Sequence, residues 1–275
     1  MLPTPPTLPH EPLIRLGCCL GVLVLMALWE LVAPCRPLFA PKGHRWGSNL
    51  GLVALNTLIL RTVLPLTAVN LATIATEHHW GILSLLTLPF WLQVVLSVVL
   101  LDLIIYGQHV LFHAIPLLWR LHKVHHADLD LDVTTGLRFH PLEILLSMGI
   151  KFVAIVLLGT PALAVIIFEI LLNATALFNH SNVSLPQGID RVLRWVIVTP
   201  DMHRVHHSVI PAESNRNFGF NLPWWDYLFG TYRDRPSLDV QAMAIGLLEY
   251  QQDLRVVTLP EMLMLPFRPL MREHG

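Results

Sequence analysis

The chain has 275 residues, of which 54% are hydrophobic and only 13% are charged, and its mean hydropathy is +0.58. Soluble proteins carry about 25% charged residues, so this composition indicates a membrane protein and excludes an ordinary soluble domain. The formal net charge of −1 provides no basic face, which excludes nucleic acid as a partner. Cys18, Cys19 and Cys35 form neither a disulfide framework nor a C-x-x-C metal motif.

Apolar stretches predict membrane helices over residues 13–33, 50–76 and 82–106. Arg61 lies near the middle of the second stretch, where a charge is costly, so we expect it to face a partner or a polar cavity. Pro65 is expected to kink the same helix. The basic residues between the first two stretches, Arg36, Lys42 and Arg45, predict by the positive-inside tendency that this loop is cytoplasmic.

A further apolar stretch, 142–178, has 37 residues and is too long for one membrane helix. Gly159-Thr160-Pro161 near its centre predicts a turn, so we expect a hairpin of two helices of about 17 residues. Lys151 and Glu169 each lie nine residues from Thr160, at the same depth, and are predicted to pair inside the membrane. The fold class is therefore an all-α integral membrane protein with about four to five membrane helices.

Histidines are concentrated in one H-x-x-x-H and two H-x-x-H-H patterns, at 109–113, 122–126 and 203–207. Histidines four residues apart lie on one helix face, and adjacent ones point about 100° apart and can serve two neighbouring metals. Imidazole suits first-row metals, and this number of ligands exceeds the need of one tetrahedral zinc ion. The spacing predicts a dinuclear site, with Thr199 or Asp201 capping the helix of the last cluster.

Other polar residues near these clusters are assigned to exposed positions. Asp128, Asp130 and Asp132 alternate as in a calcium loop, but the Gly and Glu of an EF-hand are absent, so a solvated loop is predicted. Trp224 and Trp225 are expected to be anchors at the membrane interface.

Several segments between Asp102 and Tyr232 form one combination of motifs: D-L-I-I-Y-G-Q-H, H-V-L-F-H, L-W-R-L-H-K-V-H-H, R-F-H-P-L-E, F-N-H-S-N, T-P-D-M-H-R-V-H-H-S and W-W-D-Y-L-F-G-T-Y. This combination resembles the fatty acid hydroxylase superfamily, which includes sterol desaturases and related membrane di-iron oxygenases. The resemblance implies two iron ions, O2 as cosubstrate, and hydroxylation or desaturation of a sterol, fatty acyl or ether lipid. It also implies a cytosolic helical cap that carries the histidine-rich dimetal site.

Carried over by motif, the resemblance implies ten metal ligands: His109, His113, His122, His125, His126, His140, His180, His203, His206 and His207. Asp102 and Asp226 are expected to contribute to catalysis by orienting imidazole N–H groups, and Glu143 and Asp201 are further candidates for that role. The chain departs from the family pattern at Val110, where many members have Arg. The F-N-H-S-N segment also has only His180, where some members have a second histidine four residues on.

We expect three parts: N-terminal membrane helices (1–100), a fatty acid hydroxylase-like catalytic domain that includes the hairpin 142–178 (101–235), and a C-terminal cytosolic tail (236–275). The protein is predicted to be multi-pass, with its metal site on the cytoplasmic face. No haem- or flavin-binding segment is recognisable, so the expected partners are a lipid substrate and a separate electron-donor protein of cytochrome b5 or ferredoxin type. The alternative is a membrane metal-binding or metal-transport protein, but transport sites lie near mid-membrane, whereas the clustered histidines lie outside the spans.

Overall fold

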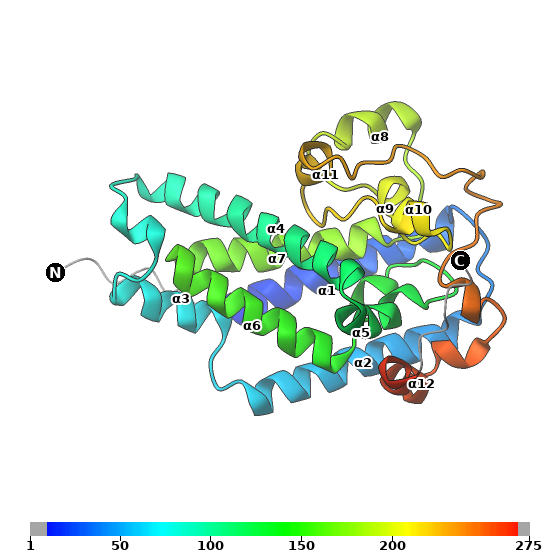
Figure 1. The fold of residues 1–275 in the computed structure, drawn as a ribbon, viewed down its shortest axis with the longest axis horizontal. Helices are drawn as coiled ribbons and strands as arrows, with labels where there is room; N and C mark the ends of the chain where they lie inside the picture. The colour runs from blue at the N-terminus through cyan, green and yellow to red at the C-terminus, as the bar shows by residue number, and fades with distance from the viewer. Residues whose placement is uncertain (1–9, 269–275) are drawn as a thin grey trace.

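A computed structural model describes residues 10–268 as an all-helical protein, in which the only β-pairing is one isolated bridge between Ser208 and Ile245. Long helices form an elongated bundle, and short helices gather into a cap at one end (Figure 1). The bundle consists of α1 (Glu11–Val32), α2 (Lys42–Val63), α3 (Ala68–Glu77), α4 (Phe90–Ala114), α6 (Pro141–Leu158) and α7 (Ala162–Asn179). The cap contains α5 (Pro116–His126), α8 (Gln187–Leu193), α9 (Pro200–His206), α10 (Pro211–Ser214), α11 (Trp224–Leu228) and α12 (Leu259–Met264). Single 3-10 turns are η1 (Ile82–Leu85), η2 (Thr135–Leu137), η3 (Leu248–Tyr250), η4 (Leu254–Val257) and η5 (Leu265–Phe267).

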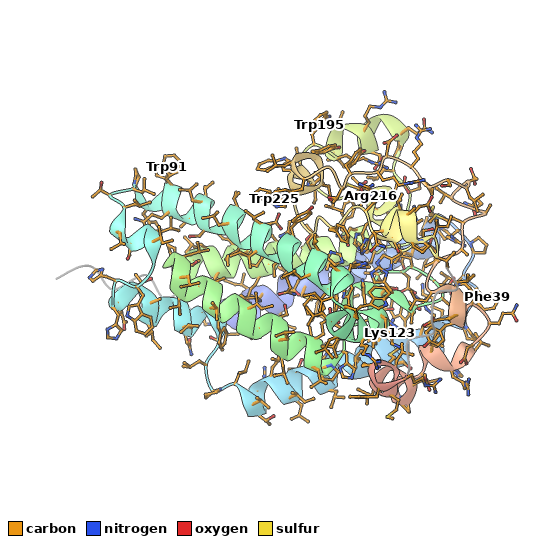
Figure 2. The ribbon with its side chains drawn as sticks, in the orientation of Figure 1. Phe39, Trp91, Lys123, Trp195, Arg216 and Trp225 are labelled. Atoms are coloured by element: carbon orange, nitrogen blue, oxygen red, sulfur yellow. The ribbon has the colours of Figure 1, made fainter. Side chains whose placement is uncertain are left out.

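Five segments of the described chain are long and apolar enough to cross a membrane: Glu11–Val32, Lys42–Leu85, Phe90–Ala114, Pro141–Leu158 and Ala162–Asn179. The prediction of four to five membrane helices is confirmed. Large apolar side chains such as Leu25 on α1 and Trp91 on α4 are exposed on the outside of the bundle. Figure 2 shows Trp91 near the end of the bundle that lies away from the cap. This apolar exterior is the surface that lipid would cover.

Helix α7 is the central helix of the bundle, and it contacts α1, α3, α4 and α9. Val165 packs with Ile155 of α6, and Phe168 packs with Leu101 of α4; all four side chains are buried. A helix that is covered on several sides must be apolar around most of its circumference, which explains why the sequence of α7 shows little amphipathic pattern. Its position brings the residue that follows it, His180, into the cap.

The predicted hairpin is confirmed, since α6 ends at Leu158 and α7 begins at Ala162. Gly159 has a φ of 70°, and a Cβ atom built there would lie 2.2 Å from the carbonyl oxygen of Trp80. Only glycine combines this left-handed conformation with so close an approach of another backbone. The turn therefore depends on Gly159.

The predicted ion pair inside the hairpin is also confirmed. Lys151 Nζ donates to Glu169 Oε1 at 2.8 Å, and both side chains are buried. Arg15 of α1 adds a second cation, with its Nη2 atom 2.6 Å from Glu169 Oε2, and it also pairs with Glu11 at 2.7 Å. The pair is thus one part of an ionic cluster that joins α1, α6 and α7.

The second span differs from the prediction in its bounds and in its break. Helix α2 begins at Lys42 rather than Leu50, and it ends at Val63. Pro65 interrupts the span instead of kinking it, because proline lacks the N–H group that a continuing helix needs and restricts the residue before it. Arg61 consequently lies in the last turn of α2 and is exposed, so the expectation that it faces a partner or polar cavity is wrong. At a helix C-terminus its charge is favoured by the exposed carbonyl groups.

The expectation of a solvated loop at residues 128–132 is wrong. Arg45 of α2 is fully buried and donates to Asp128 at 2.8 and 2.9 Å and to Asp132 at 2.6 Å, and Asp130 is also buried. Burial by itself would raise the pKa of Asp128, but the guanidinium groups of Arg45 and Arg138 outweigh that effect and lower it to about 2. Buried charges persist when they are paired and hydrogen-bonded, which is the case here.

Residues after 236 pack onto α2 and α5. Tyr250, Val256 and Met262 form a hydrophobic cluster with Leu52 of α2 and Val124 of α5. All five side chains are buried. The described part of this C-terminal segment therefore supports the outer side of α5, whose other residues carry a histidine cluster.

Candidate metal centre

Two helices joined by a sharp break carry the first five clustered histidines. Helix α4 ends at Ala114, and Pro116 occupies the first turn of α5, a position that proline tolerates although it breaks a helix interior. The helix breaks at Pro116, and the two helices fold against each other. The last turns of α4 and the whole of α5 thus present their histidines to one another, namely His109, His113, His122, His125 and His126.

The remaining histidines lie on α9 and at the end of α7. Thr199 caps α9 by accepting a hydrogen bond from the Met202 N–H at 3.4 Å, which confirms one of the two predicted caps. His203 and His206 lie within this short helix, and His207 directly follows it. His180 is the residue after the last turn of α7.

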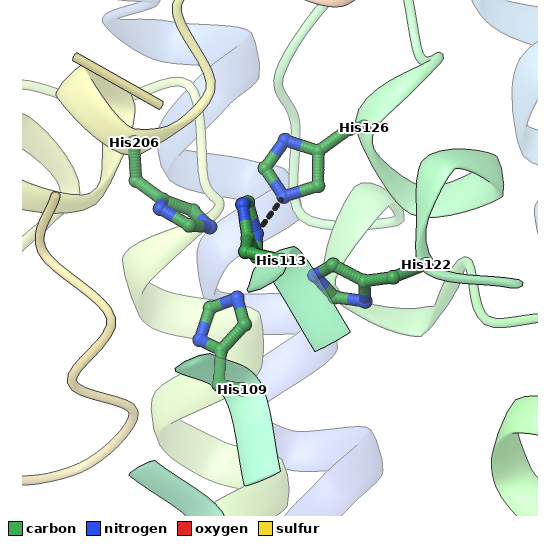
Figure 3. Close-up of side chains that lie close together, drawn as sticks. All are labelled: His109, His113, His122, His126 and His206. Atoms are coloured by element: carbon green, nitrogen blue, oxygen red, sulfur yellow. Dashed lines mark hydrogen bonds between the residues drawn. The ribbon is translucent and has the colours of Figure 1, made fainter. Parts of the chain in front are cut away.

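Nine histidines form two groups, in each of which the ligating nitrogen atoms lie within 4.8 Å of one another. The first group is His109, His113, His122, His126 and His206, and the second is His125, His180, His203 and His207. Figure 3 shows the five rings of the first group arranged around one point. The predicted convergence of the H-x-x-H-H segments and His180 is confirmed; their role as metal ligands stays a prediction.

Adjacent histidines divide between the two groups. His125 and His126 have ring planes 88° apart, and so do His206 and His207. The groups touch where the rings of His126 and His207 stack, with their centroids 4.6 Å apart. The arrangement matches the helical argument from the sequence, in which neighbouring imidazoles serve neighbouring sites.

The distances between ring nitrogens fit metal coordination. His113 Nε2 lies 3.1 Å from His126 Nε2 in the first group, and in the second group His180 Nε2 lies 3.1 Å from His125 Nε2 and 3.0 Å from His203 Nε2. Imidazole nitrogens bind first-row metals at about 2.0–2.1 Å, so two donors on one ion lie about 3 Å apart. Each group is therefore spaced to hold one ion.

Most of these histidines have a buried ring nitrogen without a hydrogen-bond partner among the described residues. This atom is Nε2 in His109, His122, His206 and His207, and Nδ1 in His125, His126 and His203, whose Nε2 atoms face other imidazoles. Burial, followed by repulsion from neighbouring histidines, lowers the pKa of His125, His126 and His207 well below the usual value. Neutral imidazoles with free lone pairs are the form that binds a metal.

The opposite ring nitrogens are held by fixed acceptors. The Nδ1 atoms of His109, His180 and His206 lie 2.8, 2.7 and 2.8 Å from backbone carbonyl oxygens. A carbonyl oxygen can only accept, so each Nδ1 carries the proton and each Nε2 carries the lone pair. A metal-binding histidine usually has its second nitrogen held in this way, which sets the orientation of the ring.

Glu143 performs the same task for His122. Its Oε1 atom accepts from His122 Nδ1 at 2.7 Å, and both side chains are buried. The sequence identified Glu143 as a further candidate for orienting an imidazole. The structure shows why α6 supplies the group: Glu143 lies in the first turn of that helix, directly under α5.

Asp226 contacts none of the nine histidines directly, and instead organises the backbone beside one of them. It accepts from the N–H groups of Phe218 and Gly219, each at 2.8 Å. The carbonyl group of the same Phe218 accepts from His109. Burial raises the pKa of Asp226 to about 6, although its hydrogen bonds act in the opposite direction. Asp226 therefore acts on His109 through the backbone.

Asp226 thus holds the start of the loop 218–222, and Asp102 holds its other end. Its Oδ2 atom accepts from Trp225 Nε1 at 2.8 Å and from the Leu222 N–H at 3.2 Å. Trp225 is buried by this contact, so the expectation that it is an interfacial anchor is wrong, whereas Trp224 is 44% exposed. The indole N–H of Trp225 needed a buried acceptor, and α4 supplies one.

His140 lies outside both groups. Its Nδ1 atom accepts from the Leu142 N–H at 3.2 Å and thereby caps α6, and its Nε2 atom is 3.3 Å from the carbonyl oxygen of Leu263. Both nitrogens are thus engaged in contacts that hold the start of α6. Nine of the ten histidines implied by the resemblance come together, and His140 does not.

The sequence reasoning missed Asn215. Its Oδ1 atom lies 3.3 Å from His113 Nδ1, and the carbonyl of the next residue, Arg216, accepts from His206. A residue that contacts a ring through a loop 102 positions away has no spacing pattern that could reveal it.

Replacing Glu143 by leucine is expected to weaken metal binding about 10- to 100-fold, because the acceptor that orients His122 is lost. Glu143→Gln keeps an oxygen atom but loses the charge, so its effect should be smaller. Titration of metal-free protein with ferrous iron against a chelator measures both. Glu249→Gln, at an exposed position, is the control. Equal affinities in all four proteins would show that His122 needs no such support.

Comparisons with known proteins agree with this geometry. A family model described as fatty acid hydroxylase matches residues 94–231, half of the chain. The chain is 28% identical over 230 residues to ornithine lipid hydroxylase OlsE of Rhizobium tropici, covering 79% of this chain and 66% of that protein. It is 26% identical over 200 residues to alkylglycerol monooxygenase of Xenopus tropicalis, covering 70% and 43%. It is 26% identical over 231 residues to cholesterol 25-hydroxylase of Rattus norvegicus, covering 80% and 74%.

The chain spans just under two thirds of the first of these relatives and less than half of the second. No solved structure matches. The family match begins within α4 and ends just after α11, and it contains all nine grouped histidines. The chain belongs to the fatty acid hydroxylase family.

Proposed function

We propose that this protein is an O2-dependent di-iron enzyme that hydroxylates or desaturates a membrane lipid. The family match supports an oxygenase, and the named relatives are a hydroxylase of an ornithine lipid, a monooxygenase of alkylglycerol and a hydroxylase of cholesterol. Because all three names describe oxygen insertion into a lipid, hydroxylation is the reaction that they favour. The membrane-spanning helices support a substrate that is itself a component of the bilayer.

The observation that carries the proposal is the division of adjacent histidines between two touching groups. A purely structural site needs only four ligands, whereas here nine neutral donors surround two neighbouring points. Carboxylate-free ligand sets of this kind leave most of the positive charge on the ions. That charge favours the binding of O2 and its reduction.

His109, His113, His122, His126 and His206 would hold one iron ion, and His125, His180, His203 and His207 the other. When bound, the two ions supply the activation of O2 that C–H oxidation requires. In hydroxylation one oxygen atom enters the C–H bond and the other leaves as water, which consumes two electrons and two protons. The protein's own residues orient the imidazoles, through Glu143 and backbone carbonyls, and the buried site keeps bulk water away.

The electrons would come from a separate protein of cytochrome b5 or ferredoxin type. We also propose that Asp102 and Asp226 serve the reaction as positioning residues, through the loop that holds His109. The metal site is proposed to face the cytoplasm, and the chain to comprise membrane helices (1–100), a catalytic domain (101–235) and a C-terminal segment (236–275). The basic residues between the first two spans, including Arg36 and Lys42, support this orientation.

Mass spectrometry of membrane lipids from cells with and without the protein tests the proposal. We expect a lipid heavier by one oxygen atom in cells that express it, or one lighter by two hydrogen atoms if the reaction is desaturation. Growth under heavy-isotope oxygen gas should transfer the label to a hydroxylated product. An unchanged lipid profile in cells that contain iron-loaded protein and a competent electron donor would contradict the proposal.

A further inference from the structure

A cavity of about 420 Å³ lies within the bundle, between α1, α2, α4, α6 and α7. It is distinct from the space between the histidine groups, and none of the nine histidines lines it. Most of its lining comes from membrane-spanning helices, including apolar residues such as Ile105, Met148 and Leu172. A largely apolar cavity with a few polar groups is the usual form of a small-molecule site.

One end of the cavity adjoins both histidine groups. Phe139 lines the cavity and stacks on His125, with ring centroids 4.6 Å apart. Glu143 lines it as well and accepts from His122 at 2.7 Å. A single layer of side chains therefore separates the cavity from the candidate metal centre.

The other end carries the ionic cluster of the hairpin. Arg15, Lys151 and Glu169 all line the cavity. Lys151 donates to Glu169 and to no other acceptor among the described residues, although its ammonium group has three N–H donors. With Glu11, which pairs with Arg15, the cluster contains two cations and two anions. Its charge is balanced, so a neutral ligand fits beside it and an anion would leave an uncompensated buried charge.

Two amide groups along the cavity have free acceptors. Asn56 Oδ1 and Gln108 Oε1 are buried atoms without a hydrogen-bond partner in the described chain. Asn56 is fixed in this orientation, because its Nδ2 atom donates to the Phe139 carbonyl at 2.8 Å. Gln108 contacts Ser147, one helical turn from Lys151. The cavity thus offers a free donor at Lys151 and a free acceptor at Gln108, the combination that a hydroxyl group satisfies.

The two ends are separated by a defined length of helix. Lys151 follows Glu143 by eight positions on α6, and Ala176 follows Glu169 by seven positions on α7. At 1.5 Å per residue both intervals are about 10–12 Å. A ligand anchored at Lys151 would place a carbon atom about that far away beside the histidine groups.

We infer that this cavity binds a neutral lipid alcohol, with its hydroxyl group at Lys151 and the carbon to be oxidised about 10–12 Å away, at the Phe139 end. The inference rests on the proposed function, since it names the substrate class of the same site. The hydroxyl accepts a hydrogen bond from Lys151 Nζ and donates to a free acceptor of the cavity wall. Lys151 is accordingly a residue that determines specificity, and the distance from its ammonium group determines which carbon is oxidised.

Binding of three probes of equal chain length tests this inference without any turnover. Radiolabelled 1-decanol, n-decane and decanoate are titrated onto the full-length, iron-loaded protein in nanodiscs, and empty nanodiscs correct for partition into lipid. We expect decanol to bind about tenfold more tightly than decane, as one hydrogen bond from a charged donor implies, and more tightly than decanoate. Equal binding of decanol and decane, or tighter binding of decanoate, would overturn the inference.

Two variants test whether the preference for decanol over decane depends on Lys151. Lys151→Met should reduce the preference for decanol over decane to near unity while decane binding persists. Lys151→Met/Glu169→Leu removes one charge of each sign, keeps the cluster balanced, and should lose the preference in the same way. A preference that survives in a variant that still binds decane would overturn the assignment to Lys151. If neither variant folds, the ranking of the three probes on the wild-type protein decides whether the inference stands.

The assay separates this inference from the proposed function. Selective decanol binding that depends on Lys151, in a protein that oxidises no lipid, would support the cavity and contradict the enzyme. Lipid oxidation by a protein that shows no alcohol preference would support the enzyme and overturn the cavity assignment. When both hold, the position of the new oxygen in the oxidised lipid should lie at the distance from its hydroxyl group that the cavity sets.

Discussion

Replacing either His122 or His203 by alanine is expected to abolish product formation. His122 belongs to the first histidine group and His203 to the second, so the two changes remove ligands from different candidate iron sites. The imidazole rings of both residues are buried among the other histidines, so no solvent-exposed ligand is available to replace the one that is lost. Because the two groups touch, loss of an ion from either one removes the dinuclear centre. Both histidines lie outside the membrane-spanning segments, so insertion should be unaffected.

Lipid mass spectrometry measures the product, elemental analysis measures the bound iron, and membrane fractionation measures insertion. His44→Ala provides a matched control, since His44 is an exposed histidine on α2. His140→Ala should keep its iron but lose the capping contact of α6, at a cost of about 1 kcal/mol, together with the contact to the Leu263 carbonyl group. Full turnover by His122→Ala or His203→Ala would show that the active site lies elsewhere.

Replacing Arg45 by methionine is expected to lower the free energy of unfolding by about 3–5 kcal/mol, the usual cost of removing one partner from a buried ion pair. The change leaves Asp128 and Asp132 in the interior without the guanidinium group that contacts both. These carboxylates lie immediately after α5, so the loss of Arg45 should also displace the histidines of that helix. Denaturant unfolding in detergent measures the stability, and iron titration measures the effect on the metal centre.

Arg61→Met is the matched control, because Arg61 belongs to the same helix but is exposed. The pKa of Asp128 is lowered to about 2 in the folded protein, so its contribution to stability is complete above its unfolded value of about 3.9. That contribution should be lost as the pH falls through about 2. Equal stability of the two arginine variants at neutral pH would contradict the role of Arg45 as the central cation.

Local spacing in the sequence determined much of the candidate site and of the bundle. The four-residue intervals of His109 with His113 and of His122 with His126 identified helix faces, and adjacent histidines indicated two sites. Gly159-Thr160-Pro161 located the hairpin turn, and equal distances from it paired Lys151 with Glu169. These inferences succeeded because helical geometry relates sequence separation to direction and depth without any knowledge of neighbouring helices.

Contacts between distant segments were decided only by the tertiary structure. The burial of Asp128 depends on Arg45, which is 83 positions away, and the acceptor for His113 lies 102 positions away at Asn215. Likewise, Trp225 is buried because Asp102 of α4 accepts its indole N–H. In each case the local sequence was compatible with an exposed position.

The physical reason is that a polar side chain is stable at the surface or, with a partner, in the interior, and local spacing does not distinguish the two. The partner is supplied by the rotation and packing of another helix, which depend on the whole set of side chains at the interface. For this protein the sequence by itself determined which histidines share a helix face. Helix packing decided which ring belongs to which group, and which carboxylates support them.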